Sequence, residues 1–182
     1  MFDSNFKYSI FYDTNNILVS NVNSNTKSVS VTNYENNIPI GKRTITVEVT
    51  SPADLTSNNS VELTVDDISP EINITSPVNG YNTSNTTLNI TFNITDNIFN
   101  ETNELTYNVS VNEKNQSGTT TSGNNVNVEI QNALINGTNT ITVKADDPAG
   151  NSKTVNITIT VNTEKPEPNL SLIHISEPTR PY

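Results

Sequence analysis

Leu88-Asn89-Ile90-Thr91-Phe92-Asn93-Ile94-Thr95 alternates apolar and polar side chains without interruption. In an extended chain, successive side chains point to opposite faces, so Leu88, Ile90, Phe92 and Ile94 share one face. A period of two predicts a β-strand with one buried and one solvated face. No segment of the chain shows convincing 3.6-residue periodicity, so we expect strands rather than helices.

The same alternation recurs on both sides of this stretch. It is found in Ile72-Ile74, Leu105-Tyr107-Val109-Val111, Val126-Val128-Ile130, Ile141-Val143-Ala145 and Val155-Ile157-Ile159-Val161. Turn-forming residues separate the strands, in Pro77-Val78-Asn79-Gly80, Gln116-Ser117-Gly118, Ser122-Gly123-Asn124, Asn136-Gly137 and Asp147-Pro148-Ala149-Gly150-Asn151. Short strands at this spacing predict an all-β fold, a two-sheet antiparallel sandwich.

The chain also repeats itself. Thr44-Ile45-Thr46-Val47 recurs as Thr140-Ile141-Thr142-Val143, and at the same offset of 96 residues Pro52-Ala53 matches Pro148-Ala149. One offset covers about thirty residues without a gap. A repeat at domain length is the mark of an array of modules, so we expect tandem β-modules.

The offset predicts the domain organisation. Residues 68–163 are expected to form a complete module, and residues 164–169 a linker or the start of a third module. Subtracting 96 from 68 places the start of the first module before residue 1, so residues 1–67 are expected to be a partial module that lacks the counterpart of residues 68–96. A shorter, complete first module is the alternative. Residues 170–182 resemble a translated sequencing-library adapter and are expected to be an artefact.

Composition excludes several classes of protein. The chain holds 33 Asn, 27 Thr and 18 Ser, carries a net charge of −10 and has no Cys. Nucleic acids and anionic membranes attract Lys and Arg, so neither is an expected partner. No apolar run approaches the roughly 18 residues of a membrane span, and we expect no membrane insertion. With no Cys, and with His174 in the segment attributed to the adapter, we do not expect an enzyme.

One longer motif carries a family resemblance. Leu134-x-x-Gly137-x-Asn139-x-Ile141-x-Val143-x-Ala145-x-Asp147-x-Ala149-Gly150-Asn151 resembles a strand signature of bacterial immunoglobulin-like domains, as does the opening Pro70-x-Ile72-x-Ile74-x-Ser76-Pro77-x-Asn79-Gly80. The resemblance implies tandem immunoglobulin-like sandwiches of the kind repeated in adhesin-like surface proteins. The first module departs from this pattern, with Arg43 in the place of Asn139 and Leu55 in the place of Asn151.

Three functions follow as hypotheses. The first is a structural spacer or adhesin stalk in an extracellular, cell-surface repeat protein, with neighbouring immunoglobulin-like modules as its partners. Short Pro-containing linkers at residues 66–70 and 163–168 favour such a rod. The second is an accessory module of a secreted carbohydrate-active enzyme. The third is a module that itself binds a host or cell-surface protein or a glycan.

Carboxylates gather at the predicted ends of the modules. Ca²⁺ prefers oxygen ligands on flexible loops, so we consider a calcium site formed by Asp66, Asp67, Asp96, Asp146 and Asp147. The alternative is that these Asp residues form Asx turns and keep the surface soluble.

Two further kinds of site are open. The chain is rich in N-x-S/T sequons, and in a host that glycosylates them we expect glycans on outward-facing positions, among them Asn73, Asn89, Asn93, Asn136 and Asn156. Phe92 and Tyr107 lie in phase with the predicted core. Tyr81 and Phe99 fall in predicted loops, where they are candidates for contact with a sugar.

Overall fold

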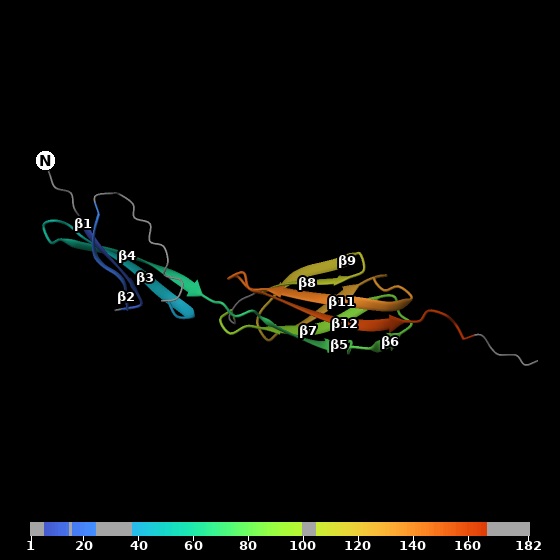
Figure 1. Ribbon diagram of the computed structural model, residues 1–182. Helices are drawn as coiled ribbons and strands as arrows, with labels where there is room; N and C mark the ends of the chain where they lie inside the picture. Colours follow the sequence, from blue (N-terminus) through green and yellow to red (C-terminus); the bar gives the residue numbers. More distant parts are fainter. Residues whose placement is uncertain (1–5, 15, 25–37, 100–104, 167–182) are drawn as a thin grey trace, which may run out of the picture.

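The computed structural model describes residues 6–14, 16–24, 38–99 and 105–166 and shows two β-modules joined by one short linker (Figure 1). All regular structure in these residues is β-strand. The strands are β1 (Phe6–Tyr12), β2 (Asn16–Ser24), β3 (Gly41–Thr50), β4 (Thr56–Val65), β5 (Glu71–Ser76), β6 (Tyr81–Thr83), β7 (Leu88–Thr95), β8 (Leu105–Val111), β9 (Lys114–Thr120), β10 (Asn125–Ile130), β11 (Gly137–Asp146) and β12 (Ser152–Val161).

The second module, β5 to β12, is a two-sheet sandwich, and the predicted all-β fold class is confirmed. One sheet has the order β10-β7-β5 and the other β6-β12-β11-β8-β9. The pairing is antiparallel except that β6 runs parallel to β12, because the chain crosses from one sheet to the other after β5. The sequence alternation did not reveal this short parallel strand.

The core of the second module lies between its two sheets. Leu88, Ile90, Phe92 and Ile94 on β7 are each at most 1% exposed, as their period of two predicts. The Phe92 ring meets the edge of Tyr107 from the opposite sheet, with ring centroids 5.3 Å apart and planes at 80°. Such an edge-to-face pair adds stabilisation beyond the area it buries.

The first module shows one sheet among the described residues, with the order β2-β1-β3-β4. All three pairings are antiparallel. At the start of β3, Arg43 donates to the carbonyl oxygens of Pro39 at 3.0 Å and Ile40 at 2.6 Å, and it pairs with Asp13 at 3.2 Å. Arg43 therefore anchors the segment that leads into its strand.

Asn139 does the same at the equivalent position of the second module. It is 1% exposed, and its side-chain nitrogen donates to the carbonyl oxygens of Ile135 at 2.8 Å and Gly137 at 3.0 Å. Pro39 and Ile135 are themselves 96 residues apart. Arg43 differs from Asn139 in residue type, but its guanidinium binds the preceding backbone carbonyl oxygens as the Asn139 amide does.

Two expectations for the second module are wrong. Gln116-Ser117-Gly118 lies within β9 instead of forming a turn. Gly118 is needed there because a Cβ atom at this position would overlap the phenol ring of Tyr107 on the neighbouring strand. Phe99 is 8% exposed and belongs to the core, so it does not offer a ring to a sugar.

The terminal segment falls outside this description. Residues 170–182, which resemble the adapter, and residues 167–169 of the expected linker lie beyond the described residues. Across the described ranges, no helix has the length and apolar character needed to cross a bilayer.

Candidate metal centre

Three of the five candidate calcium ligands come together at the junction of the two modules. Asp66 follows the last residue of β4, Asp96 follows β7, and Asp147 follows β11. One carboxylate oxygen from each lies within 4.8 Å of the others. Residues far apart in the sequence thus form one cluster that joins the linker to the second module.

Asp96 and Asp147 are each held by their own loop. Asp96 Oδ1 accepts hydrogen bonds from the backbone nitrogens of Ile98 at 2.8 Å and Phe99 at 2.9 Å. Asp147 is 6% exposed, and its Oδ1 accepts from the backbone nitrogen of Asn151 at 2.9 Å. The bond from Ile98 to Asp96 is an Asx turn, the alternative role considered for these residues, whereas the bond to Asp147 comes from a residue four positions on. Both bonds orient their side chains, and Oδ2 of Asp96 stays without a hydrogen bond.

Asp66 is fixed by one local bond and one long-range bond. Its Oδ1 accepts from the backbone nitrogen of Ile68 at 3.1 Å. Its carbonyl oxygen accepts from the Asn151 side chain at 3.3 Å, and the same Asn151 nitrogen donates to Asp147 Oδ2 at 3.0 Å. Asn151 is therefore a supporting residue that the sequence did not single out as part of a site, although it ends the family-like motif.

The cluster contains two buried oxygen atoms without a hydrogen-bond partner among the described residues, Oδ2 of Asp66 and Oδ2 of Asp96. Burial raises the pKa of Asp66 above its usual value, and the charges of Asp96, Asp147 and Asp67 raise it further. Two buried acceptors without donors, in a group of like charges, are unfavourable unless something positive lies between them.

These residues fit a hard divalent cation. Ca²⁺ takes six to eight oxygen ligands from carboxylates, carbonyl groups and water in flexible geometry. The cluster offers three carboxylates, two of them with a free and buried oxygen. A cation there would supply the missing partner for both oxygens and would offset the repulsion among the three Asp residues.

The other two predicted ligands lie elsewhere. Asp67 is exposed and does not belong to the cluster. Asp146 accepts hydrogen bonds from Lys144 and Ser152, which lower its pKa below the usual value. Alternation along the chain thus gives Asp146 and Asp147 different neighbours.

Asn162 occupies the matching place at the far end of the second module. It follows β12 as Asp66 follows β4, and it is 96 residues away from Asp66. Its Oδ1 accepts from the backbone nitrogen of Glu164 at 2.9 Å, as Oδ1 of Asp66 accepts from Ile68. The local turn is therefore repeated, but with a neutral amide.

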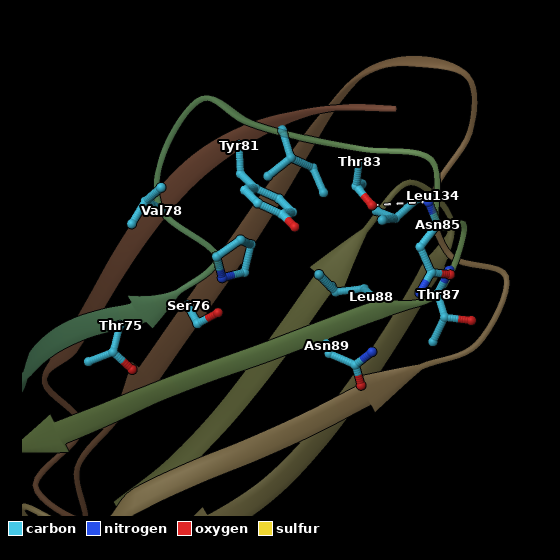
Figure 2. A pocket seen from close by; sticks show the side chains of 12 residues that line it. Thr75, Ser76, Val78, Tyr81, Thr83, Asn85, Thr87, Leu88, Asn89 and Leu134 are labelled. Carbon is cyan, nitrogen blue, oxygen red and sulfur yellow. Dashed lines mark hydrogen bonds between the residues drawn. The ribbon is translucent and has the colours of Figure 1, made fainter. Parts of the chain in front are cut away.

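A hollow of about 380 Å³ opens at the start of β7, at the other end of that strand from Asp96. Figure 2 shows Tyr81 reaching over it, with Leu88 at its floor and Thr87 and Asn89 at its rim. Its lining has no charged residue. Tyr81, one of the two candidate sugar contacts, is 49% exposed.

The five candidate glycosylation positions are all on the second module. Asn73, Asn89, Asn136 and Asn156 are exposed, and Asn93 is half buried. The Oδ1 atom of Asn136 accepts from the backbone nitrogen of Thr163 at 3.3 Å. Exposure makes the first four reachable by a modifying enzyme, and their modification stays a prediction.

Sequence comparison agrees with the geometry of the second module. Residues 76–163 match the model of a family described as the bacterial Ig-like domain. This module is immunoglobulin-like. Immunoglobulin-like domains are typically non-catalytic accessory modules. The match runs from the last residue of β5 through β12 and includes two residues of the cluster, Asp96 and Asp147, while Asp66 and the rest of β5 lie before it. No curated protein matches the chain.

Three solved structures are similar to the chain at low identity and low TM-score. Fibronectin(III)-like modules of Clostridium thermocellum CbhA give a TM-score of 0.47 at 14% identity, covering 85% of this chain and 77% of that one. Extracellular cadherin domains 3–6 of protocadherin gamma B2 give 0.37 at 16%, covering 88% and 40%. A 1.5-MDa bacterial ice-binding adhesin gives 0.41 at 20%, covering 90% and 55%. At these TM-scores the similarity has no bearing on what the immunoglobulin-like module binds.

Proposed function

We propose that this chain is part of an extracellular, cell-surface repeat protein in which immunoglobulin-like modules act as spacers, and that Ca²⁺ fixes the junction between them. One observation carries the proposal: Asp66, the residue directly after β4 of the first module, shares a carboxylate cluster with Asp96 and Asp147 of the second.

The proposed role of the cation is to stiffen the junction between the two modules. A single peptide bond separates Val65, the last residue of β4, from Asp66. A cation that holds Asp66 against Asp96 and Asp147 therefore restrains the whole first sheet, because a β-strand transmits the constraint along its length. Without the cation, repulsion among the three carboxylates favours separation of the linker from the second module. Calcium would convert a hinge into a rigid joint.

The proposed location agrees with this chemistry. Extracellular modules bind Ca²⁺ with dissociation constants of about 10⁻⁴–10⁻³ M, a range suited to the calcium outside cells. The acidic, Asn- and Thr-rich surface keeps such a rod hydrated, and the net charge of −10 opposes its association with nucleic acid.

The calcium part is tested on the full chain in millimolar CaCl₂ and in EDTA. At calcium ten times above its dissociation constant, binding should stabilise the fold by about 1.4 kcal/mol and raise the Tm. Small-angle X-ray scattering should show a narrower distribution of inter-module angles. Asp66→Asn should abolish both effects. Asp67→Asn, in the same linker but outside the cluster, is the matched control, and an equal loss in this control would contradict the site.

The spacer part is tested by the neighbouring coding sequence. Further modules of about 96 residues ending in a wall or membrane anchor support the stalk. A catalytic domain next to these modules supports the second candidate, an accessory module of a secreted carbohydrate-active enzyme. The uncharged hollow beside Tyr81 favours a third candidate, binding of a neutral glycan, which a glycan screen with Tyr81→Ala as control would test.

A further inference from the structure

The hollow beside Tyr81 arises where the chain leaves one sheet of the second module for the other. β5 pairs with β7 only as far as Thr91, so residues 88–90 of β7 have no described strand on that side. The chain then passes through Pro77 and joins the opposite sheet as β6, beside β12. The hollow of about 380 Å³ is the space left between these two paths (Figure 2).

The walls of the hollow are held in place by hydrogen bonds to the rest of the module. In the loop before Tyr81, Oδ1 of Asn79 accepts from the backbone nitrogen of Thr158 at 2.8 Å and from its hydroxyl at 3.1 Å. On the other side, the backbone nitrogen of Leu134 donates to the carbonyl oxygen of Thr86 at 2.9 Å. The hollow is therefore formed before any ligand arrives, which reduces the entropy lost on binding.

The lining combines apolar side chains inside with neutral hydrogen-bonding groups at the rim. Leu88, Leu134 and Ile159 line the hollow and are at most 4% exposed. The hydroxyl groups of Ser76 and Thr87 also line it, and they make no hydrogen bond to any described residue. Each can donate one hydrogen bond and accept others, so both are available to a ligand.

Tyr81 adds an exposed aromatic ring to these groups. Figure 2 shows the ring over the hollow, where the apolar C–H face of a sugar can pack against it. The lining has no charged residue, and the net charge of −10 opposes acidic ligands. The volume is at the small end of the range of about 300–1,000 Å³ for ligand sites, which favours a single sugar ring over a long chain segment.

We infer that the hollow binds one neutral sugar ring, the terminal unit of a glycan, with its C–H face on Tyr81 and its hydroxyl groups on Ser76 and Thr87. This inference rests on the third candidate function, glycan binding, and specifies its ligand class and its residues. It is independent of the spacer and calcium proposals, because the hollow and the Asp96 cluster lie at opposite ends of β7.

The test titrates the full chain with single sugars and follows backbone amides by NMR. The probes are the methyl glycosides of glucose, galactose, mannose and N-acetylglucosamine, with those of glucuronic acid and N-acetylneuraminic acid as charged counterparts. EDTA keeps the carboxylate cluster free of metal. The expression host should attach no N-glycans, because the candidate glycosylation position Asn89 lies on the rim. At least one neutral glycoside should shift the amides of Tyr81 and Thr87, and the charged ones should not.

Three variants identify the contacts. Tyr81→Ala should weaken binding by about tenfold or more, whereas Tyr81→Phe keeps the ring and should retain most of the affinity. Thr87→Val preserves the shape of the side chain and should weaken binding by about threefold to tenfold through loss of one hydroxyl. Thr138→Val makes the same change at an exposed position of β11 outside the hollow and should leave binding unchanged.

The outcomes separate this inference from the candidate function on which it rests. Binding of a neutral glycoside that Tyr81→Ala and Thr87→Val leave unchanged would overturn the inference, since the sugar would then occupy another place, and glycan binding itself would stand. Equal binding of the charged glycosides would also overturn it. If none of the probes shifts any amide at millimolar concentration, both the inference and the glycan-binding candidate fail.

Discussion

The side-chain amide of Asn151 donates a hydrogen bond to the backbone carbonyl oxygen of Asp66, 3.3 Å away. The same nitrogen donates to Asp147 at 3.0 Å, so one side chain connects the linker to the β11–β12 turn. The bond holds Asp66 near the cluster independently of any cation. Pre-organisation of this kind lowers the entropy lost when a ligand binds.

Asn151→Ala should therefore weaken calcium binding and reduce stability. Loss of the amide leaves the Asp66 carbonyl and Asp147 Oδ2 without this donor, which should lower the free energy of unfolding by about 1–2 kcal/mol. Calorimetric calcium titration and urea unfolding measure the two effects. Asn89→Ala, at an exposed position of β7, is the control and should change neither. An unchanged calcium affinity in Asn151→Ala would show that this bond does not organise the site.

The pH dependence of the metal-free protein should reveal the crowded carboxylates. Burial and neighbouring charges raise the pKa of Asp66 above its usual 3.8. The folded state then holds a proton more tightly than the unfolded state, so stability falls as pH rises from 3.8 through the raised folded pKa. Asp66→Asn removes this fall and, in EDTA at pH 7, should be more stable than the original protein.

The difference between the two proteins should shrink as pH falls through the same window. Asp146, whose pKa is lowered by Lys144 and Ser152, loses its stabilising contribution at low pH in both proteins and cancels in the comparison. In calcium the order should reverse, because only the original protein binds the ion through Asp66. Thermal unfolding at a series of pH values measures this. A less stable Asp66→Asn in EDTA at pH 7 would show that repulsion is not the dominant effect.

Asn139 should be more important to stability than Arg43, although both hold the segment before their strand. Asn139 also accepts hydrogen bonds from the backbone nitrogen of Ile135 at 2.9 Å and from Asn112 at 3.0 Å. Asn139→Ala leaves several buried groups without partners, each lowering the free energy of unfolding by about 1–3 kcal/mol. Arg43 is half buried, and Arg43→Ala should have a smaller effect in urea unfolding. Equal losses would contradict this order.

Gly118→Ala should destabilise the second module by about 1–3 kcal/mol, because the added methyl group meets the Tyr107 ring. Thr119→Ala, an exposed neighbour on β9, should be nearly neutral in the same denaturation experiment. Combining Gly118→Ala with Tyr107→Leu should give less than the sum of the two single losses. Additive losses would show that the two residues are not coupled.

The core of the second module could be predicted because the alternation within each single strand shows which side chains point inward. Each apolar residue of β7 has polar neighbours on both sides, so its inward direction follows from the backbone geometry of one strand. Gly118 was misassigned to a turn because a glycine considered alone is more typical of a turn. The residue that requires a glycine there, Tyr107, lies on the neighbouring strand and is not adjacent in sequence. Phe99 was misassigned because the Asx turn at Asp96 directs it inward.

The candidate site could be predicted only in part, for a similar reason. Proximity to module ends selected five Asp residues, and the structure brings Asp66, Asp96 and Asp147 together. To predict that Asp67 and Asp146 are not in the cluster, one must know which side chains at each strand end face the junction, and the sequence does not show this. The contribution of Asn151 to Asp66 joins positions 85 residues apart, which no local pattern reveals.

The turn after β12 repeats the turn after β4 with Asn162 in place of Asp66. An amide has no charge for a cation to neutralise. A module that followed Val161 in the same arrangement would therefore form a junction that calcium does not stiffen. A fibre built from both kinds of junction would straighten at its acidic joints and keep bending at its amide joints as external calcium rises. The end-to-end distance of such a fibre would then report calcium concentration through the choice of a carboxylate or an amide at each joint.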